Sequence, residues 1–583
     1  MVKNKPVYSF EEADSKKRML LGGKGAGLSE MTRLKLPVPV GFTITTEVCT
    51  KYYDNNKKLP KDVMPAVMKN IAKMEKKTGK KWNSIKNPLL VSVRSGAATS
   101  MPGMMDTILN FGLNEKTVEG LAEQTKNPRF SWDSYRRFIQ LFGKVVFGVK
   151  DEKFDYILDE VKKKQGIQDD SKLNVESLKT IVLEYKKICE KHTKRKFPDT
   201  PDEQLVLAIE AVFKSWMGER AIVYREKNNI TKDIANGTAV NIVAMVFGNM
   251  GDDSATGVVF TRNGHNGKKE MEGEYLINAQ GEDVVAGVRT GKSIELLKKD
   301  MPKLYKELSI ACKKLEKHFK EPQDIEFTIE QGKFYLLQTR TAKMSAGALV
   351  KTSVDMVREK LIDKNRALTR IPAQQLEALL HRTMDESKIK DFKQLAKGIA
   401  ASPGAASGIV VFDVNKAIEL GNTGKKIILV RKETKPEDVP AFFSSEGILT
   451  SLGGKSSHAA IVSRGMGKPC IVGCPELKID YDKNIGMANG MTIKEGDTIT
   501  IDGSEGTVFI GQIPTIEPKV TKDFEQILDW SQKIKTLGIR ANADTPDGAV
   551  LARKFGAKGI GLCRTERMFN GSDRINLFVE MIM

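Results

Sequence analysis

Apolar and polar positions follow two different periods along this chain, and the changes of period divide it into regions. Between residues 132 and 145 apolar side chains recur every three or four positions, which is typical of a buried helix face: Trp132, Tyr135, Phe138, Ile139, Phe142 and Val145. Helical spacing extends over about residues 115–230. Strand-like runs occupy much of the first 110 residues and return at 238–290 and 324–340.

These changes predict an α/β and α+β multidomain protein, because 583 residues are too many for one core. We expect an N-terminal domain at 1–340 with a helical insertion at about 115–230, a helical linker at 341–390, an α/β domain at 391–510, a linker at 511–535 and a last segment at 536–583. The last segment reads strand, helix, strand, as at the start of a parallel sheet or barrel. Because it stops at Met583 with a helix barely begun, we expect a barrel truncated early.

Composition narrows the class of protein. Apolar residues make up 40% and charged residues 29%, as in ordinary globular domains. No run of about 18 apolar residues and no signal-like N-terminus is present, so we expect no membrane contact. The six scattered cysteines fit a reducing compartment better than a disulfide framework. We expect a cytoplasmic protein, with an organelle address on a missing C-terminal part as the alternative.

The formal net charge of +20 raises the question of a nucleic-acid partner. The lysines are spread along the chain and mixed with acids, as in "DEKFDYILDEVKKKQG", and the tightest basic cluster, "KHTKRK" at 191–196, is short. We therefore expect solvated helix faces and no nucleic acid, although part of the excess charge favours anionic substrates.

One of the five histidines, His458, lies where a glycine-rich loop turns into a helix, in "TSLGGKSSHAAIVSRGMGKPCIVG" at 450–473. A helix N-terminus presents unpaired N–H groups and a positive dipole end, which stabilise a phosphate and keep an imidazole neutral. Ser456 and Ser457 are placed to cap the helix or to donate to phosphate oxygens. These features favour a phosphohistidine, and the alternative is a histidine that merely packs.

Two further stretches carry residues suited to a nucleotide phosphate. In "LLGGKGAGLSEM" at 20–31 we expect a glycine-rich loop around Lys24, although it lacks the spacing of a P-loop. Glycine-rich backbone with a lysine charge still suits phosphate. "VSVRSGAATSMPGMMDT" at 91–107 places Arg94 at the end of a predicted strand, where it is either structural or a phosphate clamp.

The stretch "QDIEFTIEQGKFYLLQTR" at 323–340 alternates strictly, so Asp324 and Glu326 share one face of a strand. Two carboxylates at this spacing suit Mg²⁺ that bridges ATP phosphates, and the alternative is a half-exposed hairpin. The turn decides whether Gln338 joins them. A two-residue Gln331–Gly332 turn places Gln338 opposite Ile325, whereas a three-residue loop places it opposite Glu326, which we predict.

Several blocks of the sequence together resemble the pyruvate phosphate dikinase family. They are "GGKGAGLSEM", "VSVRSGA", "ATGVVFTRN", "GEYLINAQGEDVVAG", "EFTIEQGKFYLLQTR", "SPGAASG", "GGKSSHAAIVSRGMGKPC" and "GLCRTE". The resemblance runs from about residue 7 to 583. The histidine block is similar, less closely, to that of phosphoenolpyruvate synthase and of the sugar-transport phosphotransferase enzyme I.

The resemblance implies an ATP-grasp nucleotide-binding domain at 1–340, a swivelling phosphohistidine domain at 391–510 and the beginning of a (β/α)₈ barrel. It implies the reaction of ATP, phosphate and pyruvate to AMP, pyrophosphate and phosphoenolpyruvate, with Mg²⁺ as cofactor and a homodimer at full length. For the truncated chain we expect only the nucleotide half-reaction.

The same resemblance assigns site residues. The ATP-binding set is Lys24, Arg94, Thr256, Glu282, Asp324, Glu326, Gln338 and Arg340. Asp324 and Glu326 are the implied metal ligands, His458 the implied phosphocarrier, and Arg564 an implied member of the pyruvate site.

The sequence departs from the family pattern in the histidine loop, where Lys455 and Ser456 replace the usual Met and Thr, and at Arg567, where His is common. Two alternatives stay open. One is phosphoenolpyruvate synthase, which uses water in place of phosphate. The other is a non-catalytic phosphocarrier or basic binding module. A pure carrier needs no ATP site, so this alternative is disfavoured by the intact Lys24, Arg94, Asp324 and Glu326.

Overall fold

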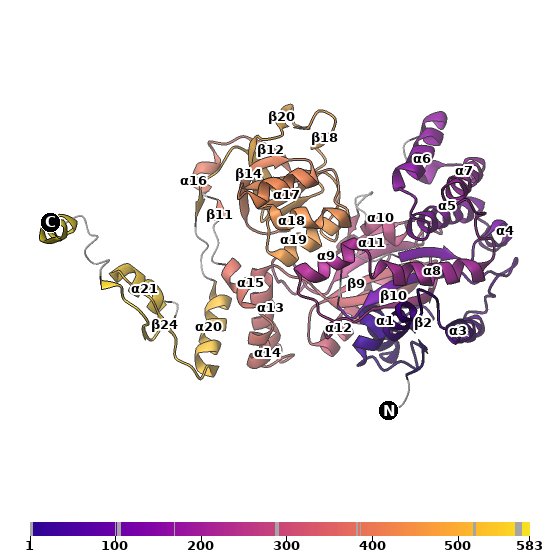
Figure 1. Ribbon diagram of the computed structural model, residues 1–583, viewed down its shortest axis with the longest axis horizontal. Coiled ribbons are helices and arrows are strands. Elements are labelled where there is room, and N and C mark those ends of the chain that lie inside the picture. Colours follow the sequence, from indigo (N-terminus) through magenta and orange to yellow (C-terminus); the bar gives the residue numbers. More distant parts are fainter. Residues whose placement is uncertain are drawn as a thin grey trace. The chain divides into compact units, whose positions relative to one another are not determined.

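The computed structural model describes residues 4–99, 101, 107–167, 170–285, 291–379, 383–384, 386–516, 521–554, 556–565 and 574–582 (Figure 1). The chain divides into two compact units. The main unit contains Met1–His265, Lys269–Ser345 and Thr383–Ile516, and the second unit contains Asn266–Lys268, Ala346–Arg382 and Glu517–Met583. The fold is mixed α/β and multidomain, as the periodicity predicts.

Two antiparallel sheets build the N-terminal part of the main unit. The first has the order β1-β2-β5-β3-β4: β1 Val7–Ser9, β2 Gly41–Ile44, β3 Val91–Ala97, β4 Thr107–Phe111 and β5 Thr238–Ala244. The second has the order β10-β9-β6-β7-β8: β6 Ala255–Phe260, β7 Glu272–Ile277, β8 Lys292–Ser293, β9 Gln323–Glu330 and β10 Lys333–Thr341.

Helices surround these sheets. They are α1 Arg18–Arg33, α2 Thr46–Asp54, α3 Val63–Thr78, α4 Glu115–Thr125, α5 Pro128–Val145, α6 Asp151–Gln165, α7 Val175–Thr193, α8 Pro201–Ser215, α9 Glu219–Lys227, α10 Gly281–Val285, α11 Ile294–Asp300 and α12 Pro302–Phe319. Helices α4 to α9 lie where the helical spacing predicts them. The predicted apolar stripe is the buried face of α5, where Tyr135, Phe138 and Phe142 are at most 1% exposed.

The glycine-rich stretch around Lys24 is a helix and not the loop that the sequence suggested. Only Gly22 leaves the helical conformation, with φ 69° and ψ 168°, and kinks α1 there. The glycines serve close packing, because a Cβ at Gly22 would lie 1.9 Å from the carbonyl oxygen of Gly96, and one at Gly25 would lie 2.7 Å from Thr43 Oγ1. Helix α1 therefore packs directly against the first sheet and carries Lys24 with it.

The hairpin of β9 and β10 corrects one prediction. Gln331 and Gly332, with φ of 46° and 72°, form a two-residue turn, and Lys333 pairs with Glu330. The predicted three-residue loop is therefore wrong. Positive φ at both positions suits the right-handed twist of the flanking strands, which favours this short turn.

The predicted neighbour of Gln338 is nevertheless confirmed. A β-bulge between Leu336 and Gln338 shifts the register by one residue, so that Gln338 lies opposite Glu326. The bulge thus produces the pairing that the sequence analysis had assigned to a longer loop.

A third, mixed sheet forms the C-terminal part of the main unit, with the order β12-β22-β21-β14-β15-β16-β17-β13. Its strands are β12 Gln394–Lys397, β13 Ile399–Ser402, β14 Ala405–Val411, β15 Ile427–Arg431, β16 Gly447–Thr450, β17 Cys470–Val472, β21 Thr498–Asp502 and β22 Thr507–Ile510. Strands β14 to β17 are parallel neighbours, accompanied by α17 Val414–Asn422, α18 Val439–Ser444 and α19 His458–Met466.

Smaller elements complete the main unit. They are the three-stranded sheet of β18 Lys478–Asp480, β19 Ile485–Ala488 and β20 Met491–Lys494, the pair of β11 Thr383–Met384 and β23 Thr515–Ile516, and α16 Glu386–Ile389. Cys470 and Cys474 are both buried, and burial raises the pKa of each thiol to about 12.

The second unit is helical where the sequence predicts linkers. It contains α13 Ala346–Arg358, α14 Lys364–Thr369, α15 Ala373–Ala378, α20 Lys522–Ile534, α21 Pro546–Lys554 and α22 Ile575–Ile582. Val350, Val354, Phe524, Ile527 and Trp530 form one core between α13 and α20, which lie side by side (Figure 1). Two segments far apart in sequence thus make one packed structure.

The predicted strand, helix, strand at the end of the sequence is confirmed. Strand β24, Arg540–Ala541, and strand β25, Gly559–Ile560, pair in parallel around α21. Several large apolar side chains of this segment are exposed: Leu537, Ile539, Val550, Ile560 and Leu562. In the described part of the chain, no helix has the length and apolar character needed to cross a membrane.

A buried ion pair ties the second sheet to α12. Arg262 is fully buried, and its Nη2 lies 2.8 Å from Glu316 Oε1. The hydroxyl of Thr261 donates to the other carboxylate oxygen at 2.8 Å. Removing one member of a buried pair leaves the other charge desolvated without its counter-charge.

We expect Glu316→Ala to lower the free energy of unfolding by about 3–5 kcal/mol, because Arg262 stays buried without this carboxylate. Urea denaturation of the variant, with the exposed neighbour Lys317→Ala as control, measures the effect. A loss equal to that of the control would show that the pair does not hold α12 in place.

Candidate functional site

A cleft of about 890 Å³ in the main unit gathers most of the predicted site residues. Its walls come from α1, β3, β6, β9, β10 and the start of α19. The predicted residues that line it are Lys24, Arg94, Thr256, Glu326, Gln338, Arg340 and His458. Basic side chains, a carboxylate and an imidazole from distant parts of the chain therefore meet in one space.

His458 is the first residue of α19, as the sequence predicts, and Ser457 is its N-cap. The Ser457 hydroxyl accepts from the N–H of Ala460 at 3.5 Å. Both imidazole nitrogens are buried, and neither has a hydrogen-bond partner in the described part of the chain. Burial lowers the pKa of His458 to about 4, with Glu437 opposing the shift and Lys343 adding to it. The ring is therefore neutral at physiological pH, with a free nitrogen lone pair.

Lys24 follows the kink of α1 and lines the cleft from this helix. Burial lowers its pKa to about 8, Glu326 opposes this shift, and Arg94 and Arg340 add to it. A lysine held among other cations at low exposure gains most from an anion placed between them.

Arg94 lies within β3 and not at the end of a strand, so its predicted position is corrected. The strand continues to Ala97, because β3 pairs with β5 through residues 91–97. The Arg94 Nε donates to Ser92 Oγ at 3.2 Å, and its side chain still reaches the cleft.

The two predicted metal carboxylates differ in their surroundings. Asp324 is 3% exposed, and its Oδ2 accepts from Arg340 Nε at 2.7 Å. Its Oδ1 is buried and has no hydrogen-bond partner within the described residues. Burial raises the pKa of Asp324, although Arg340 acts against this shift. Glu326 lines the cleft directly, opposite Gln338.

Three of the predicted site residues are not placed with a free side chain in the cleft. Thr256 lines the cleft from β6, but its hydroxyl is 3.2 Å from both Phe327 O and Thr328 Oγ1. The side chain of Glu282 lies outside the described residues. Arg564 belongs to the second unit, where its Nη1 contacts Asp544 Oδ2 at 3.3 Å.

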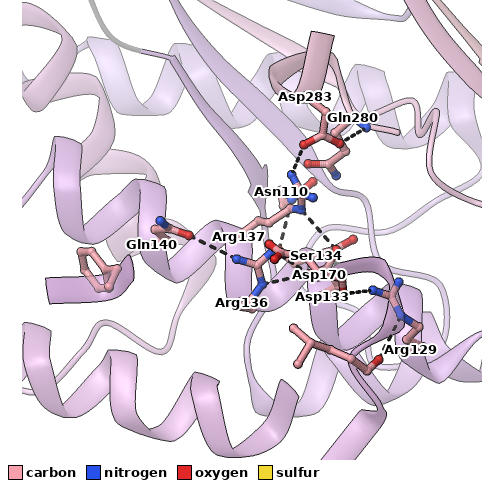
Figure 2. A network of polar contacts seen from close by, with 12 residues as sticks. Asn110, Arg129, Asp133, Ser134, Arg136, Arg137, Gln140, Asp170, Gln280 and Asp283 are labelled. Carbon is pink, nitrogen blue, oxygen red and sulfur yellow. Dashed lines mark hydrogen bonds and ion pairs between the residues drawn. The ribbon is translucent and has the colours of Figure 1, made fainter. Parts of the chain in front are cut away.

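Figure 2 shows a polar network on α5 that reaches Gln280, one of the residues that line the cleft. Arg137 Nη1 lies 2.8 Å from Asp283 Oδ1, and the other oxygen of Asp283 accepts from the Gln280 N–H at 2.9 Å. Arg137 also contacts Asp133. Burial opposes ionisation of the Asp133 carboxyl, but Arg136 and Arg137 hold its pKa well below the usual value. The network fastens the turn that carries Gln280, a cleft residue, to a buried helix.

A segment that follows β15, and that the sequence did not single out, also lines the cleft. Glu433, Thr434, Lys435, Pro436 and Glu437 line it beside His458. Glu437 Oε1 lies 2.7 Å from Arg220 Nη1 on α9. The charged stretch "KETKPEDVP" at 432–440 is the signal in the sequence, but without the fold a surface loop of this composition resembles many others.

Three family models match successive parts of the chain. The family model described as Pyruvate phosphate dikinase, AMP/ATP-binding domain matches residues 18–58, 55–314 and 303–361. The model described as PEP-utilising enzyme, mobile domain matches 423–506, and the model described as PEP-utilising enzyme, PEP-binding domain matches 518–582.

Curated relatives agree with these matches. A pyruvate, phosphate dikinase of Entamoeba histolytica is 52% identical over 580 residues, covering 99% of this chain and 65% of the relative. The enzyme of Clostridium symbiosum is 49% identical, covering 99% and 66%. The chloroplastic pyruvate, phosphate dikinase 1 of Arabidopsis thaliana is 46% identical, covering 100% and 60%. The chain thus spans 60–66% of the length of these relatives.

The comparisons correct one expectation. They do not support a chain cut so early that it is confined to the nucleotide half-reaction, because the PEP-binding domain model matches residues 518–582. The expectation of a nucleotide half-reaction alone rested on the residue at which the sequence stops, and that position carries no information about activity.

We expect the imidazole of His458 to titrate near pH 4. Its pKa in the fold is below that of the unfolded chain, so the fold binds fewer protons between about pH 4 and 6.5, and this contribution to stability decreases as the pH falls through that window. Long-range ¹H–¹⁵N spectra of ¹⁵N-histidine-labelled protein, assigned with His458→Asn, measure the titration. A midpoint near 6.5 would contradict the buried, neutral ring.

Proposed function

Because the chain belongs to the pyruvate, phosphate dikinase family, we propose that it takes a phosphoryl group from ATP onto His458 for reversible transfer to pyruvate. The products are AMP, pyrophosphate and phosphoenolpyruvate. The observation that carries the proposal is the neutral, unpartnered imidazole of His458 in one cleft with Lys24, Arg94 and Arg340. A nucleophile and a set of cations in the same space suit phosphoryl transfer.

The bond changes follow from the products. Release of AMP requires cleavage between an α-phosphate oxygen and the β-phosphorus, so a nitrogen of His458 attacks the β-phosphorus and AMP leaves with the bonding electrons. An oxygen of inorganic phosphate then attacks the γ-phosphorus, which gives pyrophosphate and leaves one phosphoryl group on His458. The neutral ring needs no base for the attack, because its lone pair is already free.

The cations of the cleft bind and orient the triphosphate. Lys24 supplies a point charge, while Arg94 and Arg340 supply planar guanidinium groups that match phosphate oxygens. Arg340 is held by Asp324, which fixes the direction of its donors. Binding of the triphosphate between these groups raises the pKa of Lys24 from about 8 and keeps the lysine charged.

The carboxylate pair fits Mg²⁺, which is a hard cation that prefers oxygen ligands. The buried, unpartnered Oδ1 of Asp324 is the observation that supports this fit, and Glu326 offers a second carboxylate two residues away on the same strand face. Bound there, Mg²⁺ supplies charge neutralisation for the phosphate oxygens. Gln338, opposite Glu326, completes this polar edge.

The finer fold assignments follow from the same proposal. We assign the first two sheets to an ATP-grasp nucleotide-binding domain, the third sheet to a swivelling phosphohistidine domain, and β24–α21–β25 to the beginning of a (β/α)₈ barrel for pyruvate. Arg564 then belongs to the phosphoryl-binding side of that barrel, where it exchanges Asp544 for substrate. A phosphoenolpyruvate synthase differs in using water, so dependence of turnover on added phosphate separates the two activities.

We expect His458→Asn to abolish the acid-labile phosphoryl group that forms on the protein from ATP, while ATP affinity changes less than about twofold. Labelling with radioactive ATP, followed by acid and base treatment, and equilibrium dialysis measure the two effects. The exposed His192→Asn is the matched control. An acid-labile phosphoryl group on the His458→Asn protein would assign the carrier role to another histidine.

We expect Glu326→Gln and Asp324→Asn each to lower the rate of AMP formation about 10–100-fold at limiting Mg²⁺, because each removes one charge from the metal ligands. The exposed Glu295→Gln on α11 is the matched control, and thermal melting reports folding. Full activity of either variant with little Mg²⁺ would show that this carboxylate does not hold the metal.

A further inference from the structure

The loop that precedes His458 is held by two carboxylates of β7 that no step of the proposed reaction uses. We propose that Lys455 is a positioning residue that fastens this loop, residues 453–457, onto the second sheet through Glu272 and Glu274, and so places His458 for attack on ATP. This inference rests on the proposed function, because it describes how the carrier is held during the nucleotide half-reaction.

Two contacts make the attachment. Lys455 Nζ lies 2.6 Å from Glu272 Oε1, and the backbone N–H of Lys455 donates to Glu274 Oε1 at 3.0 Å. The Lys455 side chain is 31% exposed and that of Glu272 10%, so the pair is screened less than a surface salt bridge.

Other contacts hold the two carboxylates and the loop in place. The second oxygen of Glu272 accepts from the Gly264 N–H at 2.9 Å, which fixes the carboxylate independently of the loop. Burial raises the pKa of Glu274, and its contact with Lys455 acts against that shift. Arg464, 1% exposed, donates from its Nη2 to the Lys455 carbonyl at 3.3 Å and so braces the loop from its own domain.

The register of the second sheet explains why this attachment matters for the reaction. Val258 of β6 pairs with Glu274 on one side and with Glu326 on the other, and Phe260 pairs in the same way with Glu272 and Asp324. Directly paired residues share a face, and neighbouring strands lie about 4.8 Å apart. The attachment and the proposed metal ligands are therefore two strands apart on one rigid face.

Gly454 shows how closely the loop approaches. A Cβ at this position would lie 2.0 Å and 2.2 Å from the carboxylate oxygens of Glu274. The φ of Gly454 is not among the positive values, so an alanine here is opposed by the Glu274 carboxylate, which has to move aside, and not by a left-handed backbone. A methyl group here thus tests docking separately from the folding of the loop.

Lys455 does not line the cleft, so its effect on the chemistry is indirect. The Glu274 contact uses only the backbone N–H of Lys455, whereas the Glu272 contact requires the charge of the lysine side chain. Replacing the lysine with an uncharged side chain of similar length therefore removes the ion pair and leaves the backbone contact.

The test compares Lys455→Met with Lys478→Met, an exposed lysine of β18, in single-turnover phosphorylation of His458 from ATP. We expect Lys455→Met to lower the maximal rate about three- to tenfold, with unchanged ATP affinity and a weaker dependence on salt. The control retains the wild-type rate. The charge exchange Lys455→Glu with Glu272→Lys is expected to recover at least half of the loss.

Gly454→Ala extends the test, because it is expected to slow phosphorylation at least tenfold through the clash with Glu274, while ATP affinity stays constant. Wild-type rates for both Lys455→Met and Gly454→Ala would overturn the proposal. If the double variant Lys455→Glu/Glu272→Lys is phosphorylated no faster than either of its single variants, the ion pair does not position the loop. Failure of the proposed function itself is distinguishable, since the wild-type protein would then acquire no phosphoryl group.

Discussion

A buried imidazole without a hydrogen-bond partner is the constraint around which the cleft is arranged. Protein interiors rarely leave polar atoms unpaired, because each one forfeits its hydration. Both nitrogens of His458 are in this state within the described residues, at the N-terminus of α19. The positive end of the helix dipole and the low exposure both disfavour the imidazolium form, so the ring stays neutral. A phosphate placed beside this unpaired imidazole is therefore a stabilising partner.

The remaining features bring that phosphate to the ring. The close packing at Gly22 and Gly25 sets α1, with Lys24, against the first sheet. The Arg340–Asp324 pair fixes a guanidinium on the hairpin of β9 and β10, and the network of Arg137 and Asp283 fixes the turn that carries Gln280. Each contact restricts one wall of the cleft, so the geometry is present before a nucleotide binds.

Much of this could be predicted from the sequence where local physics decides the structure. The start of α19 at His458, the buried stripe of α5 and the alternation of Asp324 and Glu326 follow from capping and periodicity, and all agree with the structure. Among the cleft residues, Thr256 and Arg340 were supplied only by the resemblance to a known family. The α1 helix was misread as a loop, since glycines that permit close packing look like glycines that permit a turn.

The features that could not be predicted from the sequence depend on contacts between distant segments. The bulge near Leu337 leaves no local signal, although it decides which residue faces Glu326. Lys455 meets Glu272 across 183 positions, and the acids of β7 show the same alternation as those of β9 without any sign of a partner. Such pairs become visible only when the sheets are placed together.

The position of the transferred phosphorus tests the central claim most directly. The chain is incubated with Mg²⁺, inorganic phosphate and ATP labelled either at the β- or at the γ-phosphorus, and the phosphorylated peptide is then identified. The account predicts that β-label is retained on the peptide that contains His458, in an acid-labile form, while γ-label appears in pyrophosphate. Label from the γ-phosphorus alone on that peptide, or β-label on a different residue, would contradict it.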